Sequence, residues 1–184
     1  TRDASCAPSR VNIATKPRWA LGMLGTPRRE FGNIVGHVKG VGNMSSLSSW
    51  TAQQFDPALN WGDVEWIKKR WGGKIILKGI QDVEDARLAV DSGADALIVS
   101  NTTIGRPPLQ SRHAGEAGGL SGAPLLELSH QRIKDFHALL RGRIPLIGVG
   151  GIATPHQAYK RIRAGASLVQ VYSGLVYEGP LLVK

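Results

Sequence analysis

The sequence predicts an α/β fold, half of a TIM-type (β/α) barrel with about four parallel strands. Residues 78–100 and 150–173 carry matching residues at one constant offset (150 − 78 = 72), so the chain contains an internal repeat. Each copy consists of an apolar segment, a capped helical segment that ends in glycine, and a second apolar segment. A repeated strand-helix-strand unit indicates a parallel sheet.

Four short segments are the predicted strands. Each is continuously apolar and rich in Ile, Leu or Val, as strands buried on both faces are. The segments are 75–77, 96–99, 146–147 and 168–169. We therefore expect four inner strands.

Start and stop signals define the helices between these strands. Asp82 with Asp85 resembles a capping box, and Thr154 is a cap followed by proline. Gly93 and Gly165 supply the left-handed residue that ends a helix. Three apolar stripes have helical spacing, and we expect them to face the sheet. They are Val64, Ile67 and Trp71; Val83, Ala86 and Val90; and Ile133, Phe136 and Leu140.

Charge divides the chain into two parts. The net charge is +9, and residues 1–50 hold many of the Lys and Arg residues within a stretch rich in Gly, Pro and Ser. We expect residues 1–60 to be a loop-rich basic segment and residues 61–184 to form a half (β/α) barrel. No interleaved aromatic residues or reading helix accompany the basic residues, so we expect no nucleic-acid partner. A solvated basic face and an anionic-lipid contact both stay open.

Composition indicates a cytoplasmic protein. Hydrophobic residues make up 42% of the chain, and no apolar run approaches the roughly 20 residues of a membrane-spanning helix. The single cysteine, Cys6, suits a reducing compartment. Peripheral contact with the inner membrane is the alternative.

The four strand ends are predicted to form one site, because the loops after parallel barrel strands meet at one rim. Lys78 ends the first strand, a polar triplet at 100–102 the second, the glycine pair at 150–151 the third, and Tyr172-Ser173 the fourth. A cation, small polar groups and accessible backbone N–H groups suit a phosphorylated cofactor. A solvated lysine and an ordinary tight turn are the alternatives.

Motifs in the first part of the chain support a family resemblance. They are KPRW at 16–19, FDP at 55–57, WGDVEWI at 61–67, KGI at 78–80 and IVSN at 98–101. With them, residues from about 17 to 101 resemble the second half of bacterial FMN-dependent L-lactate dehydrogenases, in the α-hydroxy-acid oxidising family.

Motifs in the second part resemble another family. They are NTT at 101–103, GGLSG at 118–122, IGVGG at 147–151 and RAGASLVQ at 163–170. With them, residues from about 97 to 184 resemble the C-terminal part of quinone-type dihydroorotate dehydrogenases. The chain therefore resembles a chimera of two FMN barrels joined at residues 99–101, which recombination or design would both produce.

The resemblance implies FMN as the cofactor. Lys78 resembles the lysine that both families place near the flavin pyrimidine ring, where a cation favours the negative charge that develops as the ring accepts electrons. Other positions match FMN contacts of the dihydroorotate family or the flavin-contacting strand end. They are Ser100, Ser121, Gly122, Gly150, Gly151, Tyr172 and Ser173.

The resemblance assigns a substrate pair but no catalytic base. Asn101 and Thr102 resemble the pair that binds orotate in the dihydroorotate family. The lactate family has its histidine base at the position of Thr102, and a threonine hydroxyl cannot accept that proton alone. The serine base of the quinone-type enzymes has no counterpart here, and we expect His113 to be a solvated loop residue. No His, Glu or Cys cluster has metal-ligand spacing.

The implied function is an FMN-binding oxidoreductase resembling dihydroorotate dehydrogenase (quinone), in pyrimidine biosynthesis and catalytically incomplete. Its implied partners are dihydroorotate or orotate and a quinone. One alternative is FMN-dependent oxidation of L-lactate or another 2-hydroxy acid. Another is a non-catalytic half-barrel assembly or design module.

Half a barrel also predicts a homo-oligomer. Four strands leave two unpaired edges and an apolar inner layer, which we expect at Ile76, Ile98, Ile147 and Val169 or their neighbours. Two copies would together supply eight strands.

Overall fold

The computed structural model describes residues 58–111 and 114–183, together with residues 17, 21, 24–25, 32, 34, 37–39, 44–54 and 56. The chain divides into two compact units, Thr1–Leu59 and Asn60–Lys184. Cys6, His113 and most of the basic residues of the first segment lie outside the described residues.

One helix of the first unit, α3 (Met44–Gln54), was not predicted from the sequence. Its serine-rich sequence has little apolar periodicity, which is the main sequence signal for a helix. Leu47 is buried, and the Thr51 hydroxyl donates a hydrogen bond of 2.8 Å to the Leu47 carbonyl.

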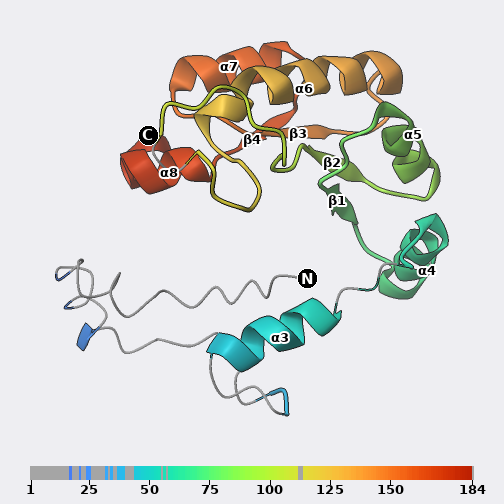
Figure 1. Ribbon diagram of the computed structural model, residues 1–184. Helices are drawn as coiled ribbons and strands as arrows, with labels where there is room; N and C mark the ends of the chain where they lie inside the picture. Colours follow the sequence, from blue (N-terminus) through green and yellow to red (C-terminus); the bar gives the residue numbers. More distant parts are fainter. Residues whose placement is uncertain are drawn as a thin grey trace. The chain divides into compact units, whose positions relative to one another are not determined.

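The second unit contains one parallel sheet with the strand order β1-β2-β3-β4 (Figure 1). The strands are β1 (Ile76–Lys78), β2 (Ala96–Val99), β3 (Leu146–Val149) and β4 (Leu168–Gln170). The predicted α/β class and the four parallel strands are confirmed. The fold is a partial (β/α) barrel with half of the eight strands of a closed one.

The prediction of four inner strands is wrong for β1 and β4. These are the edge strands of the described sheet, and Ile76 and Leu168 are 53% and 60% exposed. Continuous apolar sequence indicates burial on both faces in a complete barrel, but here only β2 and β3 have a neighbour on each side.

Helices connect and cover the strands. They are α4 (Trp61–Trp71), α5 (Val83–Asp91), the 3₁₀ helix η1 (Ala123–Leu125), α6 (Leu126–Leu140), α7 (Pro155–Arg163), α8 (Ser173–Glu178) and the 3₁₀ helix η2 (Pro180–Val183). In the part of the chain that the structure describes, none of the helices is long and apolar enough to cross a membrane.

The internal repeat is visible in the helices. The bounds of α5 and α7 differ by the predicted offset (155 − 83 = 72 and 163 − 91 = 72). Asp82 caps α5 by accepting from the Glu84 N–H, and Thr154 caps α7 by accepting from the Gln157 N–H at 3.2 Å. No bond from Asp85 back to Asp82 completes the predicted capping box among the described contacts.

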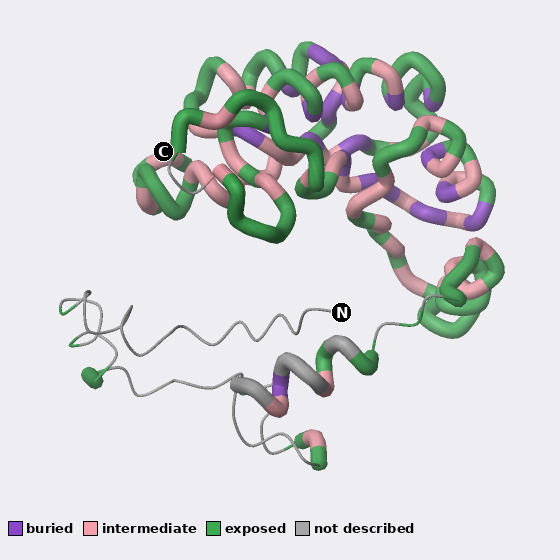
Figure 2. The backbone as a smooth tube through the Cα atoms, viewed as in Figure 1, coloured by how far each residue is buried: buried purple, intermediate pink, exposed green. Residues whose placement is uncertain are grey.

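The core lies between the sheet and helices α5, α6 and α7. The predicted stripe of Ile133, Phe136 and Leu140 is fully buried against residues of β2 and β3, including Leu97. Figure 2 shows this concentration of buried residues along α5 to α7 and the strands. By contrast, the predicted stripe on α4 is not buried, because Trp71 is 69% exposed and α4 has no buried residue.

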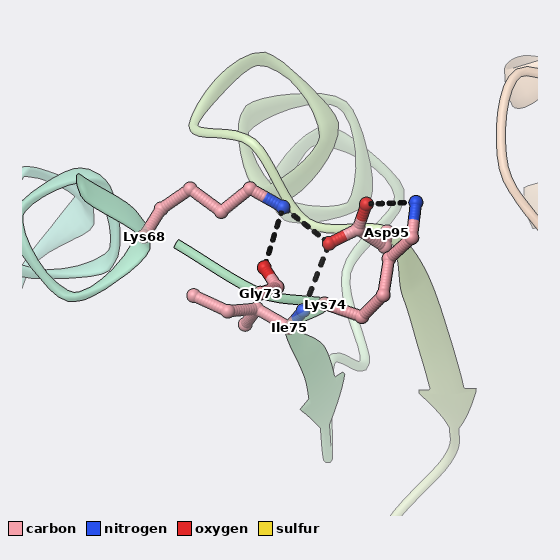
Figure 3. A network of polar contacts seen from close by, with 5 residues as sticks. All are labelled: Lys68, Gly73, Lys74, Ile75 and Asp95. Carbon is pink, nitrogen blue, oxygen red and sulfur yellow. Dashed lines mark hydrogen bonds and ion pairs between the residues drawn. The ribbon is translucent and has the colours of Figure 1, made fainter. Parts of the chain in front are cut away.

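A polar network connects α4 to the start of the sheet (Figure 3). Lys68 on α4 forms an ion pair with Asp95 and donates to the Gly73 carbonyl at 3.2 Å. Asp95 also accepts from the Ile75 N–H at 2.8 Å and from Lys74 at 3.2 Å. Asp95 therefore joins α4, the segment before β1 and the segment before β2.

Candidate cofactor site

A cavity of about 180 Å³ lies at the carboxyl ends of the four strands. Residues from the loops after all four strands line it, as the parallel arrangement requires. All ten residues that the sequence pointed to line this cavity. They are Lys78, Ser100, Asn101, Thr102, Ser121, Gly122, Gly150, Gly151, Tyr172 and Ser173.

Lys78 reaches the cavity from the end of β1. It pairs in register with Ile98, which pairs with Ile147 on β3. Residues paired in register point to the same face of a sheet, so Lys78 lies on the face opposite the buried Leu97. Lys78 forms no ion pair with any of the described residues, so its charge in the cavity is not neutralised.

The loop after β2 is folded back on itself, and this brings Ser121 and Gly122 to the cavity. Thr103 and Leu120 exchange backbone hydrogen bonds of 3.2 and 2.8 Å. Arg106 holds the same loop together, because its guanidinium donates to the carbonyls of Thr103, Gly105, Glu116 and Gly118. The Arg106 side chain thus stabilises the loop and does not line the cavity.

Asn101 and Thr102 lie side by side at the cavity. The Asn101 side-chain oxygen accepts from the Thr102 N–H at 2.9 Å, and Gln81 donates to the Thr102 carbonyl at 3.3 Å. Gly79 permits this arrangement, since a Cβ there would lie 3.2 Å from the Asn101 amide nitrogen.

Ser121 and Ser173 meet at another part of the cavity. The Ser173 hydroxyl donates to the Ser121 hydroxyl at 3.0 Å, which joins the loop after β2 to the loop after β4. A Cβ on Gly122 would contact the Ser173 Cβ at 3.4 Å. Residues 52 positions apart in the chain therefore form one small polar wall.

The glycine pair after β3 closes tightly onto α6. Gly150 and Gly151 have φ angles of +109° and +76°, which other residues rarely adopt. A Cβ on Gly151 would lie 2.6 Å from the Leu126 Cα, and a Cβ on Gly150 would lie 3.0 Å from the Ser129 hydroxyl. Glycine is thus required at both positions, where the backbone itself forms the cavity wall.

Sequence reasoning missed Gln170, which ends β4 and lines the cavity. Its side-chain oxygen is buried and accepts no hydrogen bond from the described residues. Such a group is costly unless a ligand or water satisfies it. The available signal was a polar residue at the end of an otherwise apolar strand.

Few of the side chains that line the cavity can accept or donate a proton. Its ionisable side chains are those of Lys78 and Tyr172, and none of the described lining residues is a carboxylate or a histidine. Nor do the described residues contain a group of three His, Cys, Asp or Glu residues that could hold a metal ion. The arrangement suits binding of an anionic polar ligand and offers no evident base for proton abstraction.

A larger cavity of about 440 Å³ lies between α6 and α7, away from the strand ends. His130 lines it, and burial, with the charges of Lys134 and Arg161, lowers the pKa of His130. None of the ten predicted residues lies there, and barrel chemistry occurs at strand ends. The smaller cavity is therefore the candidate site.

The family model described as dihydroorotate dehydrogenase matches residues 77–184. Two curated relatives named dihydroorotate dehydrogenase (quinone) are similar. The protein from Novosphingobium aromaticivorans is 58% identical over 116 residues, which cover 60% of this chain and 33% of the relative. The protein from Erythrobacter litoralis is 60% identical over 115 residues, which cover 59% of this chain and 34% of the relative. The chain thus spans about a third of the length of these relatives.

Two solved structures are similar in fold. DHODH from Eimeria tenella, in complex with ferulenol, is 43% identical with a TM-score of 0.53 and covers 58% of this chain and 30% of its own. A putative lactate oxidase from Pediococcus acidilactici has a TM-score of 0.53 and covers 76% of this chain and 35% of its own. At 24% identity, the second similarity concerns the fold alone.

Proposed function

Because the chain belongs to the dihydroorotate dehydrogenase family, we propose that residues 61–184 bind FMN in the cavity at the strand ends. The observation that carries this proposal is the convergence of all ten predicted residues, from four separate loops, on one cavity. Convergence of this kind is not expected of residues that are merely solvated.

The residues present fit FMN chemically. Lys78 would lie at the ring, where its unneutralised charge favours electron acceptance, and the unpaired Gln170 oxygen could accept from a ring N–H. Ser121, Ser173 and the Gly150-Gly151 backbone would hold the phosphate. When bound, FMN would supply an acceptor for hydride from the substrate. Asn101 would orient that substrate by its amide.

We propose that the chain binds FMN but catalyses the oxidation of dihydroorotate only weakly. The cavity of about 180 Å³ is smaller than the roughly 300–1,000 Å³ of most small-molecule sites, so the described wall would enclose only part of FMN. No carboxylate or histidine is present among the described lining residues to act as a base. The family's activity toward dihydroorotate would then be weak in this chain alone.

The names of the relatives support a proposal for the electron acceptor, and the chemistry of that acceptor supports one for the location. Their designation as quinone enzymes supports a quinone as acceptor and a role in pyrimidine biosynthesis. Because quinones partition into lipid, we propose peripheral contact with the inner membrane rather than insertion. Co-sedimentation with anionic vesicles containing a quinone should exceed that with neutral vesicles.

We retain the chimera as a second proposal. The motifs in residues 17–101 support it, and the similarity to the lactate oxidase adds only that 76% of the chain fits that fold. Oxidation of a 2-hydroxy acid would need a base at Thr102. Partial recovery of lactate oxidation in Thr102→His would support this proposal.

Titration with FMN tests the main proposal. Flavin fluorescence should be quenched on binding, and Lys78→Ala should weaken binding roughly tenfold to a hundredfold, since a charge-assisted contact is lost. Lys69→Ala is the matched control, because Lys69 is exposed on α4 and outside both cavities.

Two outcomes would contradict the proposal. Unchanged fluorescence at excess protein would mean that no flavin binds. Binding that moderate salt abolishes, and that is indifferent to Lys78, would indicate attraction of phosphate to a generic basic surface.

A further inference from the structure

Arg161 on α7 is the largest fully buried side chain of the described residues. Its guanidinium donates to the Gly150 carbonyl at 3.0 Å, to the Leu126 carbonyl at 3.2 Å and to the Val149 carbonyl at 3.4 Å. A Cβ on Gly148 would lie 2.9 Å from the Arg161 Cδ, so the absence of a side chain there makes room for the arginine. The end of β3 and the glycine pair after it therefore pack around the Arg161 side chain.

The charge of Arg161 forms no direct ion pair with a described carboxylate, although the charge of Glu127 on α6 favours its protonated form. Its Nε atom is buried without a hydrogen-bond partner among the described residues. Burial lowers the pKa of Arg161, but an arginine remains protonated in proteins. A buried, unpaired cation is costly to the fold, so a nearby anion would stabilise it.

The hydrogen bonds of Arg161 also fix the direction of a backbone group. The Gly150 carbonyl accepts from Arg161 and, at 2.8 Å, from the Ser129 hydroxyl on α6, so it points toward the helices. In a trans peptide the N–H points opposite to the carbonyl, and the Gly150–Gly151 bond is not cis. The Gly151 N–H therefore faces away from α6 and toward the cavity, and it donates to no acceptor among the described residues.

We propose that Arg161 is a positioning residue for the phosphate of FMN. It holds the Gly150 carbonyl inward so that the Gly151 N–H is presented to the phosphate, and its buried charge contacts the carbonyl of that same peptide group. This inference rests on the proposed FMN binding. It assigns the preference for a phosphorylated flavin to a residue that does not itself line the cavity.

Comparison of FMN with riboflavin tests the inference, because the two differ only in the phosphate. The full chain should bind FMN more tightly than riboflavin. Arg161→Met should weaken FMN binding roughly tenfold to a hundredfold and leave riboflavin binding within about twofold, since only the phosphate contact loses a charge and an aligned donor. Arg163→Met, an exposed change two residues along α7, should alter neither.

Two further variants keep the test decisive if Arg161→Met fails to fold. Ser129→Ala removes the other donor to the Gly150 carbonyl without changing charge, and should weaken FMN binding selectively but less. Arg161→Lys keeps the charge with fewer donors, and should retain part of the preference.

The outcomes separate this inference from the proposed function. If the unmodified chain binds neither flavin, both are wrong. If it binds both flavins equally, or if the Arg161 and Ser129 variants weaken FMN and riboflavin by the same factor, the proposed flavin site stands and the role of Arg161 is overturned.

Discussion

At the start of β2, Asp95 is held by Lys68, the Ile75 N–H and Lys74, and these contacts hold its pKa well below the usual range. A carboxylate with a depressed pKa stabilises the fold fully above its unfolded pKa of about 4 and loses that contribution as pH falls further. Asp95→Asn should therefore lower the free energy of unfolding at pH 7. Urea denaturation should show that the difference from the unmodified chain shrinks below about pH 4.

Glu65→Gln is the control for Asp95. Glu65 is exposed on the same connecting helix, α4, and forms none of the described ion pairs. Its substitution should have little effect at either pH. An equal loss of stability for Asp95→Asn at pH 7 and pH 3 would mean that the carboxylate charge is not what stabilises the start of the sheet.

A second residue-scale prediction concerns turnover. With threonine at position 102, anaerobic reduction of bound flavin by L-lactate or dihydroorotate should be about 10²–10⁴ slower than in an enzyme with a positioned base. Thr102→His should restore lactate reduction only in part, because the carboxylate of lactate also needs a cation, and the nearby Arg106 guanidinium is engaged by the carbonyls of its own loop. Rapid bleaching of the flavin by lactate in the unmodified chain would refute the missing-base argument.

Most of the cavity residues could be predicted because strand ends are readable from sequence, whereas Ser121 and Gly122, late in the loop after β2, were indicated by the family resemblance alone. A polar or glycine residue directly after an apolar run falls at the rim of a parallel sheet, and this rule places Lys78 and Gly150 correctly. No comparable rule predicts that Arg161 is buried. Arg161 lies among the basic residues Lys160 and Arg163, a sequence pattern typical of a solvated basic face. Only its packing under Gly148 shows that it is buried.

At the scale of elements, α6 packs on the sheet through a buried stripe, and Phe136 in this stripe is fully buried. Phe136→Ala should destabilise the fold by about 3–5 kcal/mol, through lost apolar burial and the cavity left behind. Chemical denaturation measures this loss. Leu128 lies on the same helix and is 60% exposed. Leu128→Ala should therefore change the free energy of unfolding by less than about 0.5 kcal/mol.

Helix bounds could be predicted where caps are present, as at Thr154 and Asp82. Which residues of β4 point to the inner layer could not be predicted. The sequence suggested Val169 or a neighbouring residue for the inner layer that contains Ile147. In the structure Val169 pairs with Gly148, and it is the neighbour Leu168 that pairs with Ile147. Alternation along a strand makes an error of one residue reverse the face, and a three-residue strand offers too little pattern to prevent it.

At the scale of the whole molecule, the sheet of the second unit is open. No described strand pairs with the outer edge of β1 or β4, and the apolar side chains of Ile76 and Leu168 are exposed there. Unpaired edges with apolar side chains favour pairing with another chain. The sequence could predict the number of strands but not what covers these edges, because that depends on contacts far apart in the chain or between chains.

We propose that a second copy covers the open edges, because two four-stranded sheets together have the strand number of a closed barrel. Light scattering over a dilution series should show a dimer or larger species. Leu168→Lys places a charge on the β4 edge and should lower the mass, whereas Leu128→Lys on the outer surface of α6 should not. A monodisperse monomer that melts cooperatively would instead mean that the first sixty residues cover the sheet. A mass that Leu168→Lys leaves unchanged would show that the copies meet elsewhere.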